Sequence, residues 1–113
     1  IFFIMQKYLS IYLTTNAQPA LVSATQVTGV NMAATNQIKI WYHDGGSATF
    51  TLSDHMAANN ITASNYIADQ IVAALETSWT NVVQTVTTEA DQALQGIADA
   101  AGAAVSVKSV VIA

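Results

Sequence analysis

Alternating apolar and polar residues form the clearest local pattern in the chain, in the segment "IKIWYHDGGSATFTL" (residues 38–52). Apolar residues occupy every second position on both sides of Asp44-Gly45-Gly46, which is typical of two antiparallel strands. Glycine tolerates the positive φ that a tight hairpin turn requires. The pattern therefore predicts a β-hairpin whose core-facing side carries Ile38, Ile40, Tyr42, Phe50 and Leu52.

Trp41 falls on the opposite side of this predicted hairpin, together with Lys39 and the threonines of the second strand. A large aromatic side chain left in water costs solubility. We therefore expect Trp41 to be covered by another element or by another subunit.

Three further segments have the composition of strands. "YLSIYL" (residues 8–13) is apolar and β-prone, and "NVVQTV" (residues 81–86) is shorter. The closing "AVSVKSVVIA" (residues 104–113) places alternate residues on two faces, with Val105, Val107, Ser109 and Val111 on one and Ser106, Lys108, Val110 and Ile112 on the other.

The stretch between the first strand and the hairpin gives weaker signals. Residues 14–19 are polar and end in Pro19, which predicts a loop. Residues 20–30 have a weak β pattern with a bend or bulge at Gly29. We interpret residues 31–36 as a turn.

An amphipathic helix is predicted after residue 64, with Ser64 as its N-cap. Apolar residues recur at helical spacing along one stripe, and the polar residues between them face water. The predicted stripe contains Ile67, Ala68, Ile71, Val72, Leu75 and then Ser78 or Trp79, whereas Asp69, Gln70 and Glu76 form the solvated side.

A second, alanine-rich helix is predicted within residues 87–103. Its alanines, Leu94 and Ile97 follow helical spacing, Thr88 and Asp91 resemble a capping box, and Gly102 is a natural stop. A face made mainly of alanine buries little area, so this helix is expected to pack lightly.

Together these elements predict an α+β protein in a single domain, residues 1–113. The expected architecture is a small antiparallel β-sheet or open barrel with one principal amphipathic helix and a second alanine-rich helix. Pairing of the first and last strands would close such a barrel.

Residues 1–4, "IFFI", precede the segment Met5-Gln6-Lys7, which looks like a natural start. We interpret them either as upstream translation or a processing remnant, or as an N-terminal arm that reaches a neighbour. Their rings and branched chains favour a groove over water. The apolar residues at both ends of the chain and the uncovered Trp41 are the candidates for an interface between subunits. They are Ile1, Phe2, Phe3, Ile4, Trp41, Val110 and Ile112.

Charge is unusually scarce: 9% of the 113 residues are Asp, Glu, Lys or Arg, against about 25% in a typical domain. Such a surface repels copies of itself only weakly, which favours a homo-oligomer or a larger assembly. A β-rich surface made of threonine and asparagine is the plainer explanation of the same composition.

The net charge of −4 argues against nucleic acid as a partner. The chain has three basic residues, Lys7, Lys39 and Lys108, and no arginine. Phosphate recognition needs several basic side chains on one face, which one subunit does not supply. A ring of subunits would repeat one lysine around its pore, so a ring that binds nucleic acid stays as an alternative.

Candidate chemistry is sparse. His43 and His55 each neighbour an aspartate, but the hairpin register places them at opposite ends, about 25 Å apart. A catalytic triad needs its groups to converge. We therefore expect no enzyme activity, no catalytic residue, no cofactor and no metal, unless neighbouring subunits bring the two histidines into a shared site.

Two classes of feature are missing from the sequence itself. The chain has no cysteine, which excludes disulfides and cysteine-ligated zinc. It also has no apolar run of about 18 residues, so we expect no membrane as a partner.

Four stretches, "MQKYLSIYLT", "IKIWYHDGGSATFTL", "AALETSWTNVV" and "VSVKSVVIA", together resemble small uncharacterised proteins of marine bacteriophages and ocean metagenomes. The resemblance covers most of the chain except residues 87–103, which look like an insertion. It implies an Lsm-like, SH3-type small barrel and a multimeric virion component, and it carries no catalytic residues. The sequence thus predicts a non-enzymatic, self-assembling structural protein located in a phage particle.

Overall fold

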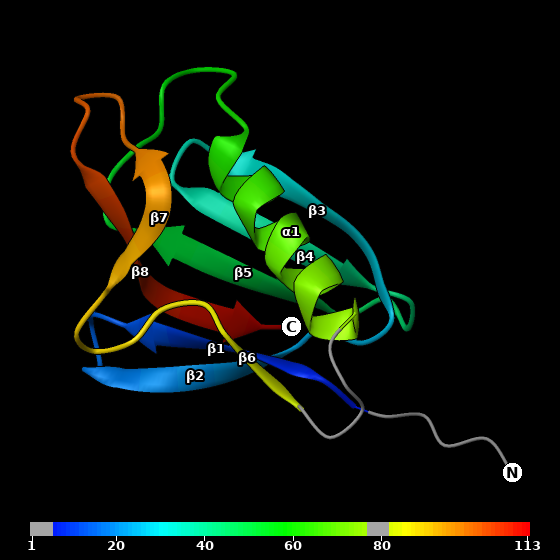
Figure 1. Ribbon diagram of the computed structural model, residues 1–113. Coiled ribbons are helices and arrows are strands. Elements are labelled where there is room, and N and C mark those ends of the chain that lie inside the picture. Colours follow the sequence, from blue (N-terminus) through cyan, green and yellow to red (C-terminus); the bar gives the residue numbers. More distant parts are fainter. Residues whose placement is uncertain (1–5, 77–81) are drawn as a thin grey trace, which may run out of the picture.

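The computed structural model describes residues 6–76 and 82–113, which form eight strands and one helix (Figure 1). Their bounds in chain order are β1 Tyr8–Leu13, β2 Gln18–Ser23, β3 Val27–Ala34, β4 Gln37–Tyr42, β5 Ser47–Leu52, α1 Thr62–Glu76, β6 Val83–Thr85, β7 Ala93–Ala98 and β8 Ala104–Ile112.

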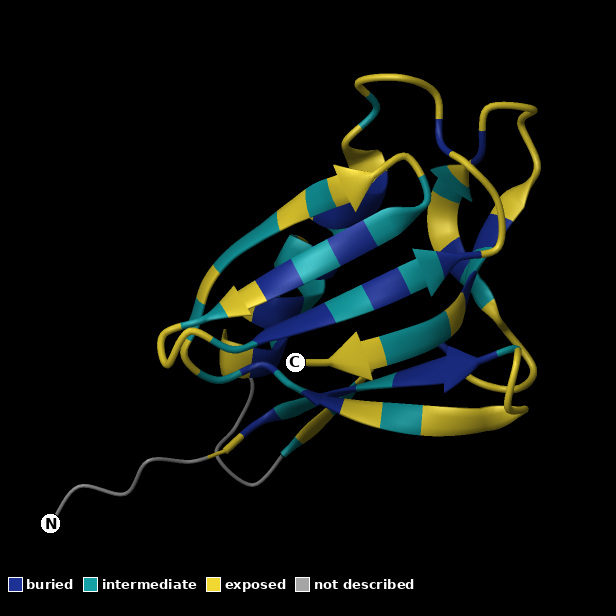
Figure 2. Cartoon of the chain, turned by 180° about the vertical axis from the view of Figure 1, so that it is seen from behind, coloured by how far each residue is buried: buried dark blue, intermediate teal, exposed yellow. Residues whose placement is uncertain are grey.

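Two sheets make up the fold. The smaller has the strand order β2-β1-β6, and the larger has the order β3-β4-β5-β8-β7. The pair β1 and β6 is parallel and the other pairs are antiparallel. The chain is thus a small α+β protein whose sheets are mostly antiparallel, and the larger sheet curls as half of a barrel (Figure 2).

The two sheets meet at a corner where β1 ends. The amides of Thr14 and Thr15 donate to the carbonyls of Val107 and Lys108 in β8, at 3.1 and 3.2 Å. The expected pairing of the first and last strands is therefore reduced to this corner, because β1 pairs along its length with β2 and β6.

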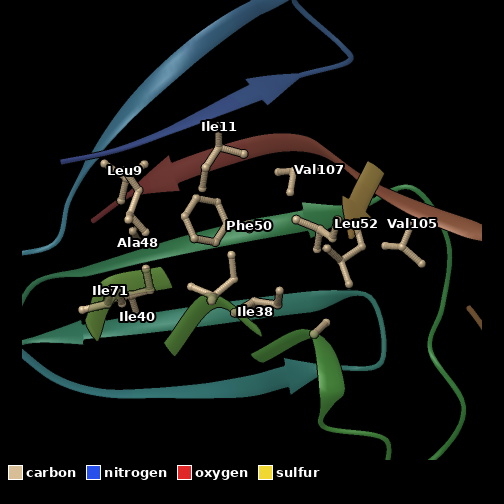
Figure 3. Close-up of a cluster of buried hydrophobic side chains, with 14 of the residues drawn as sticks. Leu9, Ile11, Ile38, Ile40, Ala48, Phe50, Leu52, Ile71, Val105 and Val107 are labelled. Atoms are coloured by element: carbon tan, nitrogen blue, oxygen red, sulfur yellow. The ribbon is translucent and has the colours of Figure 1, made fainter. Parts of the chain in front are cut away.

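The core lies between the two sheets and α1. Leu9 and Ile11 of β1 point toward Ala48 and Phe50 of β5, and all four are fully buried (Figure 3). α1 lies across the inner face of the larger sheet (Figure 1). Its buried residues are Ala63, Ser64, Ile67, Ile71 and Ala74.

The central hairpin follows the prediction. β4 and β5 pair in the register Ile38 with Phe50 and Ile40 with Ala48, and these four side chains are buried. Gly45, at φ 90°, occupies the turn, and the amide of Gly46 donates to the Asp44 carboxylate at 2.8 Å. The alternation of apolar residues and the turn glycines were therefore sufficient to predict this hairpin.

The predicted second helix is wrong. Residues 93–98 form β7, which pairs with β8. Gly96 has φ 77°, a value that no right-handed helix uses. Leu94 is buried in the core, and pairing with β8 outweighs the weak helix preference of an alanine-rich segment.

The turn after β7 is organised by Asp99. Its Oδ1 accepts from the amides of Ala101 and Ala103, both at 2.9 Å, and Gly102 follows with φ 85°. Gly102 thus closes a β-hairpin where the sequence had predicted the end of a helix.

The face assignment of the last strand needs a correction. The register with β5 shifts between Thr51–Ser109 and Leu52–Val107, which leaves Lys108 as an extra residue. Such a bulge exchanges the two faces beyond it. Val105 and Val107 therefore face the core before the bulge, and Val110 faces it afterwards.

Helix α1 begins earlier than predicted, and Ser64 is not its cap. Asn60 Oδ1 accepts from the amide of Thr62 at 3.0 Å and from its hydroxyl at 2.8 Å. Ser64 lies buried in the first turn and donates to the carbonyl of Ile61 at 3.0 Å. Ser78 and Trp79, the predicted end of the stripe, lie outside the described residues.

Two predicted loops are partly strands. Residues 31–34 belong to β3, and Pro19 belongs to β2. β2 is an edge strand, where a proline is tolerated.

Candidate interaction surfaces

Polar chemistry does not converge around the histidines. His43 lies beside the hairpin turn, where its amide donates to the carbonyl of Gln26 at 2.9 Å. His55 lies beyond the opposite end of the hairpin, with its Nδ1 at 2.6 Å from the Thr35 hydroxyl. Among residues 6–76 and 82–113, no three His, Cys, Asp or Glu side chains gather as metal ligands would.

The three lysines are dispersed. Lys7 is 5% exposed, and Lys108 is exposed on β8. Lys39 places its Nζ 4.0 Å from the centroid of the Trp41 ring, a cation–π contact on the outer face of the larger sheet. Lys7 is thus buried, and the Lys39 ammonium is engaged with an aromatic ring.

Trp41 remains 40% exposed, so the described chain covers it only in part. Because Ile38 and Ile40 of the same strand face the core, alternation places Trp41 on the outer face of the larger sheet. Its register neighbours are Gly29 on β3 and Ser47 on β5, both small. The ring thus has small neighbours across the sheet, and the Lys39 ammonium is the charged group that contacts it.

A cleft of about 370 Å³ lies between β2 and the end of β8. Leu21 and Ile112 line it and are 61% and 64% exposed. Tyr42 lies at its wall and donates its hydroxyl to the carbonyl of Ser23 at 2.6 Å. We call this feature the β2–β8 cleft; its other lining residues are Gln6, Val22, Thr25, Gln26 and Asp44.

The Tyr42 hydroxyl is held in its neutral form. Burial in the cleft wall, together with the smaller effect of the nearby Asp44 carboxylate, raises the pKa of Tyr42 to about 12. A neutral hydroxyl keeps its proton for the Ser23 carbonyl. This phenol is therefore suited to a structural role and ill suited to acid–base chemistry near neutral pH.

The free edge of β2 is protected against pairing. The backbone groups of Tyr8 and Ser10 form hydrogen bonds with the β6 segment. The backbone groups of Leu9 and Ile11 therefore form their hydrogen bonds with β2. By the same alternation, the backbone polar groups of Pro19, Leu21 and Ser23 point to the free edge. Pro19 has no amide hydrogen, and the Ser23 carbonyl is already taken by Tyr42. A strand added at this edge would therefore find few backbone groups to form hydrogen bonds with.

A second hollow of about 370 Å³, the α1–β3 groove, separates the helix from the edge strand of the larger sheet. Its lining is mainly apolar and consists of Gln26, Val27, Thr28, Gly29, Val30, Ala68, Ile71, Val72 and Leu75. Val72 and Leu75 are each more than half exposed. Both belong to the stripe that the sequence predicted to be turned away from water.

The predicted interface residues thus fall in different environments. Val110 is half-buried against the core, Ile112 lines the β2–β8 cleft, and Trp41 stands on the outer sheet face. The predicted residues Ile1, Phe2, Phe3 and Ile4 lie outside the described residues. Leu21 and the exposed side of α1 were missed.

Comparisons with protein-family models, with curated proteins and with solved structures find no match to this chain. Within the described ranges, no helix is long and apolar enough to span a membrane.

Proposed function

We propose that this protein is a non-enzymatic structural component that assembles with copies of itself. The observation that carries the proposal is the β2–β8 cleft, where Leu21 and Ile112 are both more than three-fifths exposed. Isolated apolar residues on a surface are ordinary, but apolar residues gathered around one hollow mark an interaction site.

Charge supports the same proposal. The chain carries seven acidic and three basic residues in 113, so copies repel each other weakly. Beside the cleft, Val111 is also exposed, and the last four residues of β8 are Ser-Val-Val-Ile. An uncharged, apolar strand end is suited to burial against another subunit.

A particle of a marine bacteriophage is the proposed location. Support comes from the resemblance of the motifs "IKIWYHDGGSATFTL" and "AALETSWTNVV" to phage proteins. The same resemblance suggests an Lsm-like, SH3-type barrel, and a curled five-stranded sheet of short strands is compatible with it. Mass spectrometry of purified phage particles tests the location, because a virion protein would be present at many copies per particle.

A ring that binds nucleic acid is the weaker alternative. Lys7 is almost fully buried, and the Lys39 ammonium is held over Trp41. Each subunit therefore offers little positive charge to phosphate. A shift of labelled single-stranded RNA or DNA at low salt, lost at high salt, would favour this alternative.

Sedimentation or light scattering of the purified chain at micromolar concentration tests self-assembly. We expect a discrete oligomer, and we expect Ile112→Asp to reduce its mass because the carboxylate would be buried at the contact. Ala58→Asp adds the same charge on an exposed loop and should leave the mass unchanged. A wild-type monomer over the whole concentration range would refute self-assembly.

A further inference from the structure

The helix carries a second stripe, apolar at four of its five positions, that its own core does not use. The stripe consists of Ile61, Asn65, Ala68, Val72 and Leu75, and Ile61 directly precedes the first helical residue. Ile61, Val72 and Leu75 are each more than half exposed. We call these five residues the outer stripe of α1.

The outer stripe has the spacing of a helix–helix contact. Its steps are four, three, four and three residues, which is the 3.5-residue repeat of coiled-coil seams. At 100° per residue, the stripe is centred about 120° around the helix from the buried centre at Ile67. The sheet therefore occupies one apolar side of α1, and a second side stays available for another helix.

The same stripe is complementary to itself when two helices run antiparallel. With Ala68 on a twofold axis, Leu75 meets Ile61 of the second copy, and Val72 meets Asn65. Large side chains then lie at both ends, and a small one lies at the centre, where the helices approach most closely. An isologous contact requires this kind of self-complementarity.

Charge also favours the antiparallel arrangement. α1 has no acidic residue in its first turn and no basic residue in its last turn. Its two acids are Asp69, at the midpoint of the helix, and Glu76, its last residue. A parallel pair would place the two Glu76 carboxylates side by side, whereas an antiparallel pair brings Glu76 toward the positive end of the partner helix dipole. Asp69 is next to Ala68 and lies near the contact in either arrangement.

We propose that a second copy of this chain docks on the outer stripe of α1, forming a twofold, antiparallel α1–α1 pair centred on Ala68. The proposal rests on the self-assembly proposed above and names a second surface for it, besides the β2–β8 cleft. The wall of the α1–β3 groove, residues 27–30, joins the contact. Five stripe residues alone bury less than the roughly 800 Å² per partner of a standard interface, so the pair is expected to dissociate at micromolar concentrations.

A single introduced cysteine gives a direct test, because the chain has none of its own. On the twofold axis, two Ala68→Cys side chains come within disulfide reach, which requires Cα atoms about 4.4–6.8 Å apart. Mild oxidation should therefore convert Ala68→Cys into a covalent dimer. Val72→Cys is the matched control, since its two copies lie on opposite sides of the axis, about 12 Å apart along the helix.

A charge substitution gives the second test. Val72→Asp should raise the dissociation constant of the pair at least about tenfold, while Asp69→Asn, on the solvated side, should leave it unchanged or slightly lower. Both positions are exposed, so circular dichroism and thermal unfolding of the monomer should match the wild type.

The outcomes separate this inference from self-assembly in general. If the wild type is an oligomer that Val72→Asp does not weaken, or if Val72→Cys cross-links in place of Ala68→Cys, the antiparallel α1 pair is refuted while self-assembly stands. If the wild type stays monomeric at about 100 µM, above the range expected for the pair, both proposals fail. Selective cross-linking at Ala68, together with weakening by Val72→Asp, supports the pair.

Discussion

The Tyr42 hydroxyl donates to the backbone carbonyl of Ser23 at 2.6 Å and so joins the end of β4 to the edge of β2. One side chain thereby connects the two sheets and closes a free strand edge. Tyr42→Phe would leave the carbonyl without its partner. We expect the free energy of unfolding to fall by about 1–2 kcal/mol in denaturant titrations. Tyr66→Phe, at a half-buried tyrosine on α1, should cost less.

The same tyrosine predicts a dependence on alkaline pH. The folded pKa of about 12 lies above the ordinary value of 10.0, so the folded state holds its proton where the unfolded state has lost it. The stabilisation is complete below pH 10 and is lost as the pH rises from 10 toward 12. Stability measured across this range should decline in the wild type, and the decline should be smaller in Tyr42→Phe. An equal decline in both would contradict the assignment.

Gly96 distinguishes the strand from the helix that the sequence predicts. In a helix interior, Gly96→Ala would stabilise the protein by about 1 kcal/mol. At φ 77° in β7, the same change should destabilise it by about 1–2 kcal/mol, because alanine disfavours that conformation. Gly29→Ala is the control, since Gly29 has open space and no positive φ. The sign of the change in unfolding free energy decides between the two structures.

Asp99 should be essential to the turn between β7 and β8. Its carboxylate accepts two amide hydrogen bonds, and the residue is buried. Asp99→Ala leaves both amides without this acceptor, at an expected cost of about 2–4 kcal/mol. Asp99→Asn keeps one acceptor oxygen and should recover part of that loss. Hydrogen exchange of the Ala101 and Ala103 amides should accelerate in Asp99→Ala and less in Asp99→Asn.

Phe50 is the largest fully buried side chain of the core, between Ile11 and Ile38 (Figure 3). Phe50→Ala should cost about 3–5 kcal/mol through lost burial and the cavity that remains. Val111→Ala, at an exposed position of the strand next to it, should change the monomer by no more than about 0.5 kcal/mol. Equal effects would show that the core is not centred on this ring.

Features set by neighbouring residues in the sequence could be predicted, and features set by distant contacts could not. The hairpin of β4 and β5 was predicted because alternation and the turn glycines lie within fifteen residues. β7 was missed because alanine and leucine suit either structure, and its partner β8 decides. The bulge at Lys108 follows from how β8 meets β5, and no residue type there announces it.

The interaction surfaces show the same division. Trp41 and Ile112 were predicted as interface residues; both are exposed within this chain, and their role at an interface stays a prediction. On α1, the pattern contained two overlapping apolar stripes, and a single sequence does not say which one the sheet covers. The spacing from Ile61 to Leu75 was nevertheless visible and would have indicated a second helical contact.

The parallel pairing of β1 with β6 sets the order in which this chain acquires structure during synthesis. The amide of Tyr12 is bonded to the Thr87 hydroxyl at 2.8 Å, across 75 residues of intervening chain. β3, β4 and β5 pair through contacts between near neighbours and can form early. The smaller sheet has to wait until residues 83–87 leave the ribosome, so the β1–β2 hairpin keeps one edge of β1 unpaired, open to capture by other nascent chains, through most of translation.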